Sequence, residues 1–217
     1  THRAIIIGSI AVGRTKIENC LLSDDTLKSI DILRKLGVDI KVDEKSNTVV
    51  IEGVGLKGLK ESDEDLYCGN SGTTMRLLAG LLSGQSFSSK LTGDDSLSNR
   101  PMDRVTKPLR QMGANIADNN SLAPIIISPG EIKPIDYKME VASAQVKSAI
   151  LLAGLYAEGE TIVREEITSR DHTERMLQAL GAKLIVEDGL VRISAAELYS
   201  EKIQVPGDIS SAAFFMA

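Results

Sequence analysis

The chain has 217 residues, of which 42% are hydrophobic and 25% charged, and it carries a formal net charge of −5. These proportions are typical of a globular protein that buries a core of its own. The negative charge and an aromatic content of 3% argue against a nucleic-acid-binding surface, which needs basic side chains and stacking rings.

The two cysteines, Cys20 and Cys68, lie far apart and without a neighbouring histidine, so they form neither a metal-binding motif nor a disulfide framework. This cysteine usage suits a reducing compartment. The longest apolar runs, such as residues 149–152, are too short to cross a bilayer. We therefore expect a cytoplasmic protein without a membrane partner.

The first predicted unit covers residues 1–53. An apolar helix over residues 2–13 leads into a strand and then into an amphipathic helix over residues 23–37, for which Ser23 is the N-cap candidate. Gly37 follows the last turn, where glycine readily adopts the left-handed conformation. A strand-turn-strand pattern completes the unit.

The second predicted unit covers residues 64–130 and repeats this order after a short opening strand. Gly-Asn-Ser-Gly-Thr-Thr (residues 69–74) precedes its apolar helix. Its amphipathic helix spans residues 98–113, is capped by Ser98 or Asn99, and also ends at a glycine.

The third predicted unit covers residues 136–195 and again opens with a strand. Its apolar helix spans residues 144–159, and its amphipathic helix spans residues 169–181 with Ser169 or Asp171 as the cap. The threefold β-α-β-α-β-β pattern predicts an α/β (α+β) fold with pseudo-threefold symmetry. Because the first helix of each unit is apolar nearly all round, we expect three buried parallel helices at the centre.

The two ends of the sequence break the pattern. The first unit lacks an opening strand, and residues 203–217 look like the first strand and helix of a fourth unit. We expect one pseudo-threefold domain over residues 1–202 and the start of a second at 203–217, in a fragment of a longer protein. The missing strand predicts an unpaired edge on the first sheet and some tendency to self-associate.

Parallel buried helices would bring their N-termini together, and with them unpaired N–H groups and partial positive charge. Arginines, hydroxyls and amides recur at these positions. They are Arg3, Asn70, Ser71, Gly72, Thr73, Arg76, Ser143, Gln145 and Lys147, then Arg100, Ser169, Arg170 and His172 near the second helices, and Asp208, Ser210 and Ser211 in the fourth unit. The repetition predicts an anion-binding site.

Each residue alone also has an ordinary structural explanation. A serine or asparagine at a helix start is more often a cap than a ligand contact, and a glycine there more often serves a tight turn. Lys147 can snorkel along an apolar helix, and a first-turn histidine such as His172 is commonly solvated. Arg100 is different, because a cation directly before Pro101 in a first turn would oppose the helix dipole, which favours a functional role.

Four motifs, in the same order and spacing, resemble the 5-enolpyruvylshikimate-3-phosphate (EPSP) synthase family over essentially the whole chain. They are Gly-Asn-Ser-Gly-Thr-Thr-Met-Arg, Asn-Arg-Pro-Met, Ala-Ser-Ala-Gln-Val-Lys-Ser-Ala and Ser-Arg-Asp-His-Thr-Glu. The resemblance implies two pseudo-threefold domains. It also implies transfer of the enolpyruvyl group of phosphoenolpyruvate to the 5-hydroxyl of shikimate 3-phosphate, in aromatic amino-acid synthesis, with no metal or organic cofactor.

The resemblance also implies roles for single residues. Arg3 resembles the arginine that holds the shikimate carboxylate, and Gly72 and Arg100 resemble contacts to phosphoenolpyruvate. Ser143 and Gln145 resemble ligands of shikimate 3-phosphate, with Gln145 also near the enolpyruvyl carbon.

Ser169 matches a serine on the 3-phosphate, and Thr73 lies next to the glycine that bears on glyphosate sensitivity in this family. Ala144 stands where many members have a second serine, so one phosphate hydrogen bond is absent or comes from a backbone N–H. His172 replaces a tyrosine of some members, and Arg170 beside it is expected to supply charge to the phosphate.

By the same resemblance, residues outside this sequence complete the site. A lysine and a serine would precede Thr1, and the catalytic aspartate and glutamate would follow Ala217. We therefore expect half of a substrate cleft, inactive alone, whose partners are the two small-molecule substrates and the C-terminal domain of the same chain.

Three alternatives stay open. A UDP-N-acetylglucosamine enolpyruvyl transferase would share the fold but carry a reactive loop cysteine, which neither Cys20 nor Cys68 provides. A non-catalytic module could bind phosphorylated ligands without chemistry. An RNA 3′-phosphate cyclase would need a basic surface and a nucleophilic histidine, and the net charge of −5 argues against it.

Overall fold

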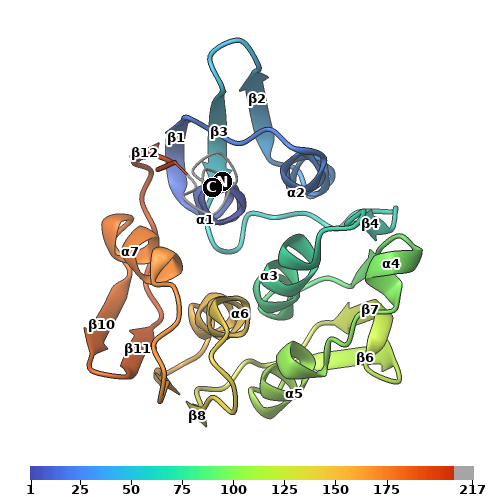
Figure 1. Ribbon diagram of the computed structural model, residues 1–217, viewed down its shortest axis with the longest axis vertical. Helices are drawn as coiled ribbons and strands as arrows, with labels where there is room; N and C mark the ends of the chain where they lie inside the picture. Colours follow the sequence, from blue (N-terminus) through green and yellow to red (C-terminus); the bar gives the residue numbers. More distant parts are fainter. Residues whose placement is uncertain (208–217) are drawn as a thin grey trace, which may run out of the picture.

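Three four-stranded sheets surround three central helices in the computed structural model, which describes residues 1–207. Figure 1 looks along the central helices, with the sheets and the remaining helices arranged around them. This arrangement confirms the predicted mixed α/β fold with a pseudo-threefold repeat. No helix within residues 1–207 is both long enough and apolar enough to span a membrane.

The three units share one order of elements. The first contains α1 (His2–Ser9), β1 (Val12–Glu18), α2 (Asp24–Lys35), β2 (Asp39–Asp43) and β3 (Thr48–Val54). The second contains β4 (Leu66–Tyr67), α3 (Gly72–Ser83), β5 (Ser89–Thr92), α4 (Asp95–Ser98), α5 (Asp103–Gln111), β6 (Asn115–Asn119) and β7 (Leu122–Ser128). The third contains β8 (Asp136–Lys138), α6 (Ala144–Gly154), β9 (Glu160–Arg164), α7 (His172–Ala179), β10 (Lys183–Glu187) and β11 (Leu190–Ser194), and β12 (Lys202–Gln204) follows it.

The sheets repeat one topology. Their strand orders are β4-β5-β7-β6, β8-β9-β11-β10 and β12-β1-β3-β2, and in each the first pair is parallel and the others antiparallel. The strand β12 therefore takes the opening place that the first unit lacks, with Ile17 opposite Ile203. The expected unpaired edge on the first sheet is thus wrong, because a strand from beyond the third unit covers it.

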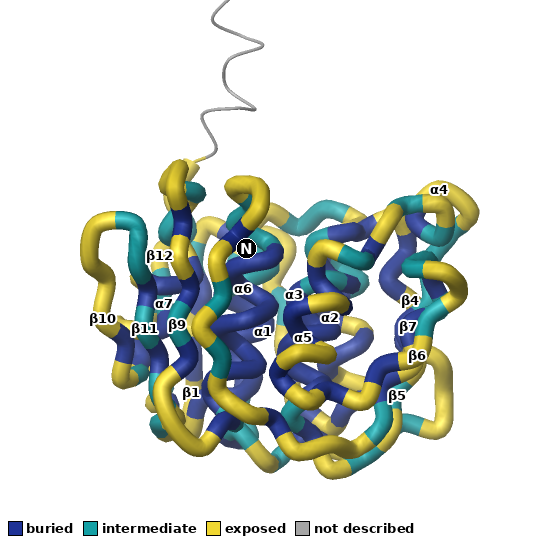
Figure 2. The backbone as a smooth tube through the Cα atoms, turned by 90° about the horizontal axis from the view of Figure 1, so that it is seen from below, coloured by how far each residue is buried: buried dark blue, intermediate teal, exposed yellow. Residues whose placement is uncertain are grey.

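The central helices α1, α3 and α6 form the middle of the core. They are the dark blue, buried stretches of Figure 2, and every residue of α1 from Ala4 to Ser9 is buried. Helices α3 and α6 pack closely at Gly80, where a Cβ atom would lie 2.2 Å from the carbonyl oxygen of Ala149. This close approach fixes how the N-terminal turns of α3 and α6 meet.

Most helix ends lie at the capping residues that the sequence predicts. Gly37, Gly113 and Gly181 have φ values of +89°, +90° and +94°, as predicted for glycines that end a helix. Ser23 caps α2, and its capping box with Thr26 satisfies two backbone donors of the first turn. The N-cap of α7 is Asp171, one of its two candidates.

The predicted start of α5 is wrong. Neither Ser98 nor Asn99 caps this helix, because Ser98 ends the separate short helix α4 and the N-cap of α5 is Met102. Arg100 precedes Pro101, and a residue before proline is disfavoured in the helical conformation. Arg100 therefore lies in the connection between two helices and not in a first turn, so our helix-dipole argument for it does not apply.

Candidate active site

The N-terminal turns of α3 and α6 meet at the side chain of Gln145. Its Nε2 atom donates a hydrogen bond to Thr73 Oγ1 at 2.8 Å, and its Oε1 atom accepts one from an Nη atom of Arg76 at 2.7 Å. Ser143 caps α6 by accepting a hydrogen bond from the backbone N–H of Val146 at 3.4 Å. Three expected site residues, Thr73, Ser143 and Gln145, are thus brought together, and the amide of Gln145 is fixed at both ends.

Gly72 lies under two guanidinium groups. A Cβ atom at this position would lie 3.1 Å from an Nη atom of Arg76 and 3.6 Å from one of Arg100. Arg100 donates hydrogen bonds to the side chain of Asn70 at 2.5 Å and to its backbone carbonyl at 3.3 Å. Because glycine has no side chain, nothing separates the backbone at this position from the two guanidinium groups, which are donors suited to an anion.

The cations around Gly72 act on one another. Burial lowers the pKa of Arg76 from its ordinary value, and the neighbouring charges of Arg100 and Arg104 lower it further. Like charges held at this spacing favour an anion between them, because its charge would relieve their repulsion.

Arg3 lies against the N-terminal ends of α6 and α7. Its Nε atom donates to Thr173 Oγ1 at 2.8 Å, and an Nη atom lies 3.4 Å from the carbonyl oxygen of Ala144. Burial lowers the pKa of Arg3, while the nearby Glu174 carboxylate raises it and the charge of Arg170 lowers it. The structure therefore places Arg3, Ala144 and Arg170 in one neighbourhood.

The arginines divide into two groups. Six of the eleven form ion pairs with carboxylates, namely Arg14, Arg34, Arg110, Arg164, Arg175 and Arg192. The other five form no ion pair within residues 1–207, and they are Arg3, Arg76, Arg100, Arg104 and Arg170. The pKa effects and contacts above place these five around the N-terminal ends of the central helices. Among residues 1–207, the arginines without a carboxylate partner are therefore concentrated where the sequence predicts an anion.

Ser169 and His172 lie before and at the start of α7. The hydroxyl of Ser169 donates to Glu165 Oε1 at 2.5 Å, and its backbone N–H donates to the same oxygen at 3.3 Å. His172 and Arg170 are exposed, whereas Ser169 is half-buried. The contacts of Asp208, Ser210 and Ser211, which we also expected here, lie outside the described residues.

Lys147, a candidate from the sequence, is placed differently from either of its expected roles. It does not snorkel, because its side chain is 2% exposed and its ammonium pairs with Glu165 at 2.6 Å and Glu174 at 2.5 Å. Arg76 and Arg104 were not assigned as substrate contacts. For Arg76 the sequence did contain an indication, because this residue lies one helical turn after Gly72 on the same helix.

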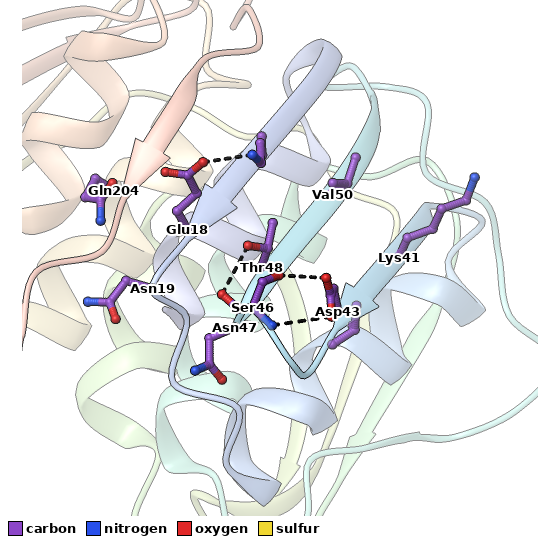
Figure 3. Close-up of a pocket in the computed structure, with 11 residues that line it drawn as sticks. Glu18, Asn19, Lys41, Asp43, Ser46, Asn47, Thr48, Val50 and Gln204 are labelled. Atoms are coloured by element: carbon purple, nitrogen blue, oxygen red, sulfur yellow. Dashed lines mark hydrogen bonds and ion pairs between the residues drawn. The ribbon is translucent and has the colours of Figure 1, made fainter.

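A separate cavity lies away from these residues. It has a volume of about 640 Å³ and opens on the face of the first sheet, between the strands that carry Glu18, Lys41 and Thr48. Figure 3 shows its polar lining, which includes Asp43 and Gln204. None of the expected site residues lines it, so the cavity and the arginine cluster are separate features.

Comparison with known proteins agrees with the resemblance. The family model described as EPSP synthase (3-phosphoshikimate 1-carboxyvinyltransferase) matches residues 1–217. The 3-phosphoshikimate 1-carboxyvinyltransferases of Alkaliphilus metalliredigens and Thermodesulfovibrio yellowstonii are 53% and 50% identical to this chain, cover all of it, and are each matched over 51% of their own length.

A solved structure of an EPSP synthase from Acinetobacter baumannii superposes with a TM-score of 0.95 at 49% identity, over 99% of this chain and 49% of that one. The chain thus spans about half the length of the curated relatives and solved structures that it matches. On the family match and these identities, the chain belongs to the EPSP synthase family.

Proposed function

We propose that this chain supplies half of the active site of a 3-phosphoshikimate 1-carboxyvinyltransferase. The enzyme moves the enolpyruvyl group of phosphoenolpyruvate to the 5-hydroxyl of shikimate 3-phosphate and releases phosphate. One observation carries the proposal: five arginines without a carboxylate partner in residues 1–207 gather at the N-terminal ends of the buried helices. Two polyanionic substrates need such a cluster, because it offsets the repulsion between them.

Phosphoenolpyruvate would bind beside Gly72. The guanidinium of Arg100 can form paired hydrogen bonds to a phosphate or carboxylate, and Arg76 stands on the other side of the same glycine. A residue larger than glycine would take the space that the anion needs. Arg76 would in addition hold Gln145, whose amide oxygen it binds at 2.7 Å.

Shikimate 3-phosphate would bind over the N-terminus of α6. We propose that Arg3 holds its carboxylate, and that Ser143 and Ser169 donate hydrogen bonds to the ligand, the latter to the 3-phosphate with Arg170 beside it. Gln145 would lie between the two substrates, because it is fixed between Thr73 of α3 and the start of α6.

The chemistry would be addition followed by elimination. The 5-hydroxyl of shikimate 3-phosphate gives up its proton to a base, its oxygen bonds to C2 of phosphoenolpyruvate, and C3 gains a proton from an acid. The C2–O bond to phosphate then breaks and C3 loses a proton. The residues described here would orient the substrates and stabilise their charge, and the remaining part of the enzyme would supply the proton-transfer groups.

The cysteines support this assignment over the UDP-N-acetylglucosamine enolpyruvyl transferase. Both are buried, Cys20 at 5% and Cys68 at 0% exposure, and burial raises the pKa of the Cys68 thiol to about 12. A reactive cysteine needs access and a thiolate near neutral pH, and neither is present at these two positions.

Binding is the first test. Titration calorimetry of the chain with shikimate 3-phosphate should show weak, salt-sensitive binding that Ser143→Ala removes. Arg100→Ala, which alters the phosphoenolpyruvate side, should change it less. A folded chain that binds no shikimate 3-phosphate would contradict the proposed half-site.

Activity needs the other half of the enzyme. In a chimera, this chain replaces the matching half of the Alkaliphilus metalliredigens relative, and phosphate release is measured with both substrates. We expect activity that Arg100→Ala removes. An inactive chimera that binds shikimate 3-phosphate normally would argue for a non-catalytic binding module.

A further inference from the structure

Lys147 is the centre of a buried ion cluster that the proposed chemistry does not use. Its ammonium pairs with two carboxylates, those of Glu165 and Glu174, and the three side chains are 2%, 4% and 2% exposed. Buried charges of this kind cost free energy unless they are paired and fully hydrogen-bonded. Glu174 is paired with Lys147 by distance, but neither of its oxygens accepts a hydrogen bond within residues 1–207. Methionine or leucine would pack here more simply, so the choice of lysine needs an explanation.

The cluster is connected to Ser169 through the two oxygens of one carboxylate. Glu165 Oε2 accepts from Lys147 at 2.6 Å, and Glu165 Oε1 accepts both the hydroxyl and the backbone N–H of Ser169. Residues 166–168 between them are exposed and irregular, so this carboxylate is what ties Ser169 to the rigid helix α6.

The cluster is also connected to Arg3, through neighbouring residues of α6 and α7. Thr173 Oγ1 accepts a hydrogen bond from Arg3 at 2.8 Å and lies 2.6 Å from the hydroxyl of Ser148, while the next residue, Glu174, pairs with Lys147. Arg3, Lys147 and the two glutamates together carry no net charge. One buried group thus supports two side chains that face the substrate half-site from different elements.

We infer that Lys147 is a positioning residue: through Glu165 it fixes Ser169, and through Glu174 it supports Arg3, for binding of shikimate 3-phosphate. The inference rests on the proposed function for the identity of the ligand. The ammonium has a second effect, because it neutralises Glu165 beside the expected phosphate. When the ligand binds, the Ser169 hydroxyl proton turns from Glu165 to the phosphate, and Glu165 keeps its partner.

A double-mutant cycle tests the connection. Affinity for shikimate 3-phosphate is measured by calorimetry on the chain itself and on Ser169→Ala, Glu165→Gln and the double variant. Glu165→Gln leaves a single acceptor oxygen, which cannot serve Lys147 and Ser169 together as the two carboxylate oxygens do. If Glu165 acts through Ser169, each single variant weakens binding about tenfold and the double variant does no worse, because the effects of residues in one network do not add.

Lys147→Met gives the direct comparison, and Lys138→Met is its matched control. Lys138 pairs with Glu166 at 2.7 Å beside the same loop, but both side chains are exposed, at 68% and 74%. Removing either lysine takes one positive charge from this region. Lys147→Met should weaken binding about tenfold or more, and Lys138→Met by less than about twofold.

Hydrogen exchange of the ligand-free chain separates the inference from the proposed function. The Ser169 amide should exchange faster in Glu165→Gln and Lys147→Met and at the normal rate in Lys138→Met. Multiplicative losses in the cycle, or an unchanged Ser169 amide in Glu165→Gln, would overturn the positioning role even if Lys147→Met does not fold. An unmutated chain that binds no shikimate 3-phosphate would instead overturn the proposed function, and the exchange rates would still decide the role of Lys147.

Discussion

Two regions of the molecule, the two corners at the starts of α6 and α3, differ in whether their buried or half-buried positive charge is paired with carboxylates. At the start of α6, the Lys147 ammonium is enclosed and paired with two carboxylates. At the start of α3, the guanidinium groups of Arg76 and Arg100 converge over Gly72 without a carboxylate partner in residues 1–207. Lys147 and Arg76 each lie near the N-terminus of a central helix, where the helix dipole disfavours a cation. The difference indicates that one corner is built for stability and position, and the other is left incomplete for a ligand.

Removing the paired cation should have the largest effect on stability. Lys147→Met leaves two carboxylates buried and unpaired, so we expect a loss of about 3–5 kcal/mol in the free energy of unfolding, measured with urea. Adding Glu165→Gln and Glu174→Gln to Lys147→Met should recover part of it, because no buried charge then remains. A loss below about 1 kcal/mol would mean that water reaches the cluster.

Moving α3 and α6 apart should have the second largest effect on stability. Gly80→Ala places a Cβ atom 2.2 Å from the carbonyl oxygen of Ala149, so α3 and α6 must move apart. We expect a loss of about 1–3 kcal/mol in stability together with weaker shikimate 3-phosphate binding, because Gln145 spans the two helices. Gly207→Ala, with nothing within 4 Å, is the control. Unchanged binding in a destabilised Gly80→Ala chain would show that helix spacing does not set the site.

Removing an unpaired cation should hardly change stability. Arg100→Gln relieves repulsion with Arg76 and breaks no ion pair in residues 1–207, so we expect a change within about 0.5 kcal/mol.

Inorganic phosphate sharpens this test. At about five times its dissociation constant it should stabilise the unmutated chain by about 1 kcal/mol in urea unfolding, and Arg100→Gln should lose that gain. Arg14→Gln, which removes an exposed ion-paired arginine, should keep it. Equal stabilisation of both variants would place the bound phosphate elsewhere.

Filling the space under the two guanidinium groups should have the smallest effect on stability. The Cβ atom of Gly72→Ala would meet the flexible end of Arg76 at 3.1 Å, so we expect a change of a few tenths of a kcal/mol. In the chimeric enzyme the KM for phosphoenolpyruvate should nevertheless rise severalfold, because the methyl group takes the ligand's place. An unchanged KM would move that ligand away from Gly72.

The sequence predicted those features that depend on local chemistry and repetition. Gly37, Gly113 and Gly181 end their helices as expected because a left-handed residue at this position favours glycine in any fold. The three apolar helices are buried because a helix apolar on all sides has no other stable place. The convergence of Thr73 and Gln145 followed from the parallel arrangement of those helices.

Features that depend on distant partners could not be predicted. From the sequence alone, Lys147 is expected to be a surface lysine. Its partners Glu165 and Glu174 belong to a loop and to α7, so no local pattern shows that they face it. The pairing of β12 with β1 joins segments that no local pattern connects. The start of α5 was missed for a local reason, because the effect of Pro101 on Arg100 was outweighed by the capping serine motif.

The strand β12 has a consequence for how the protein acquires its structure. In the first sheet, one partner of β1 is β12 (Lys202–Gln204), which is synthesised much later, and the side chain of Asn19 bonds to Val205, 186 positions away. Contacts of such separation close late, since a long loop must be ordered before they form. The first sheet is therefore the last of the three to be completed, and a nascent chain exposes the open side of β1 until synthesis has passed the third unit.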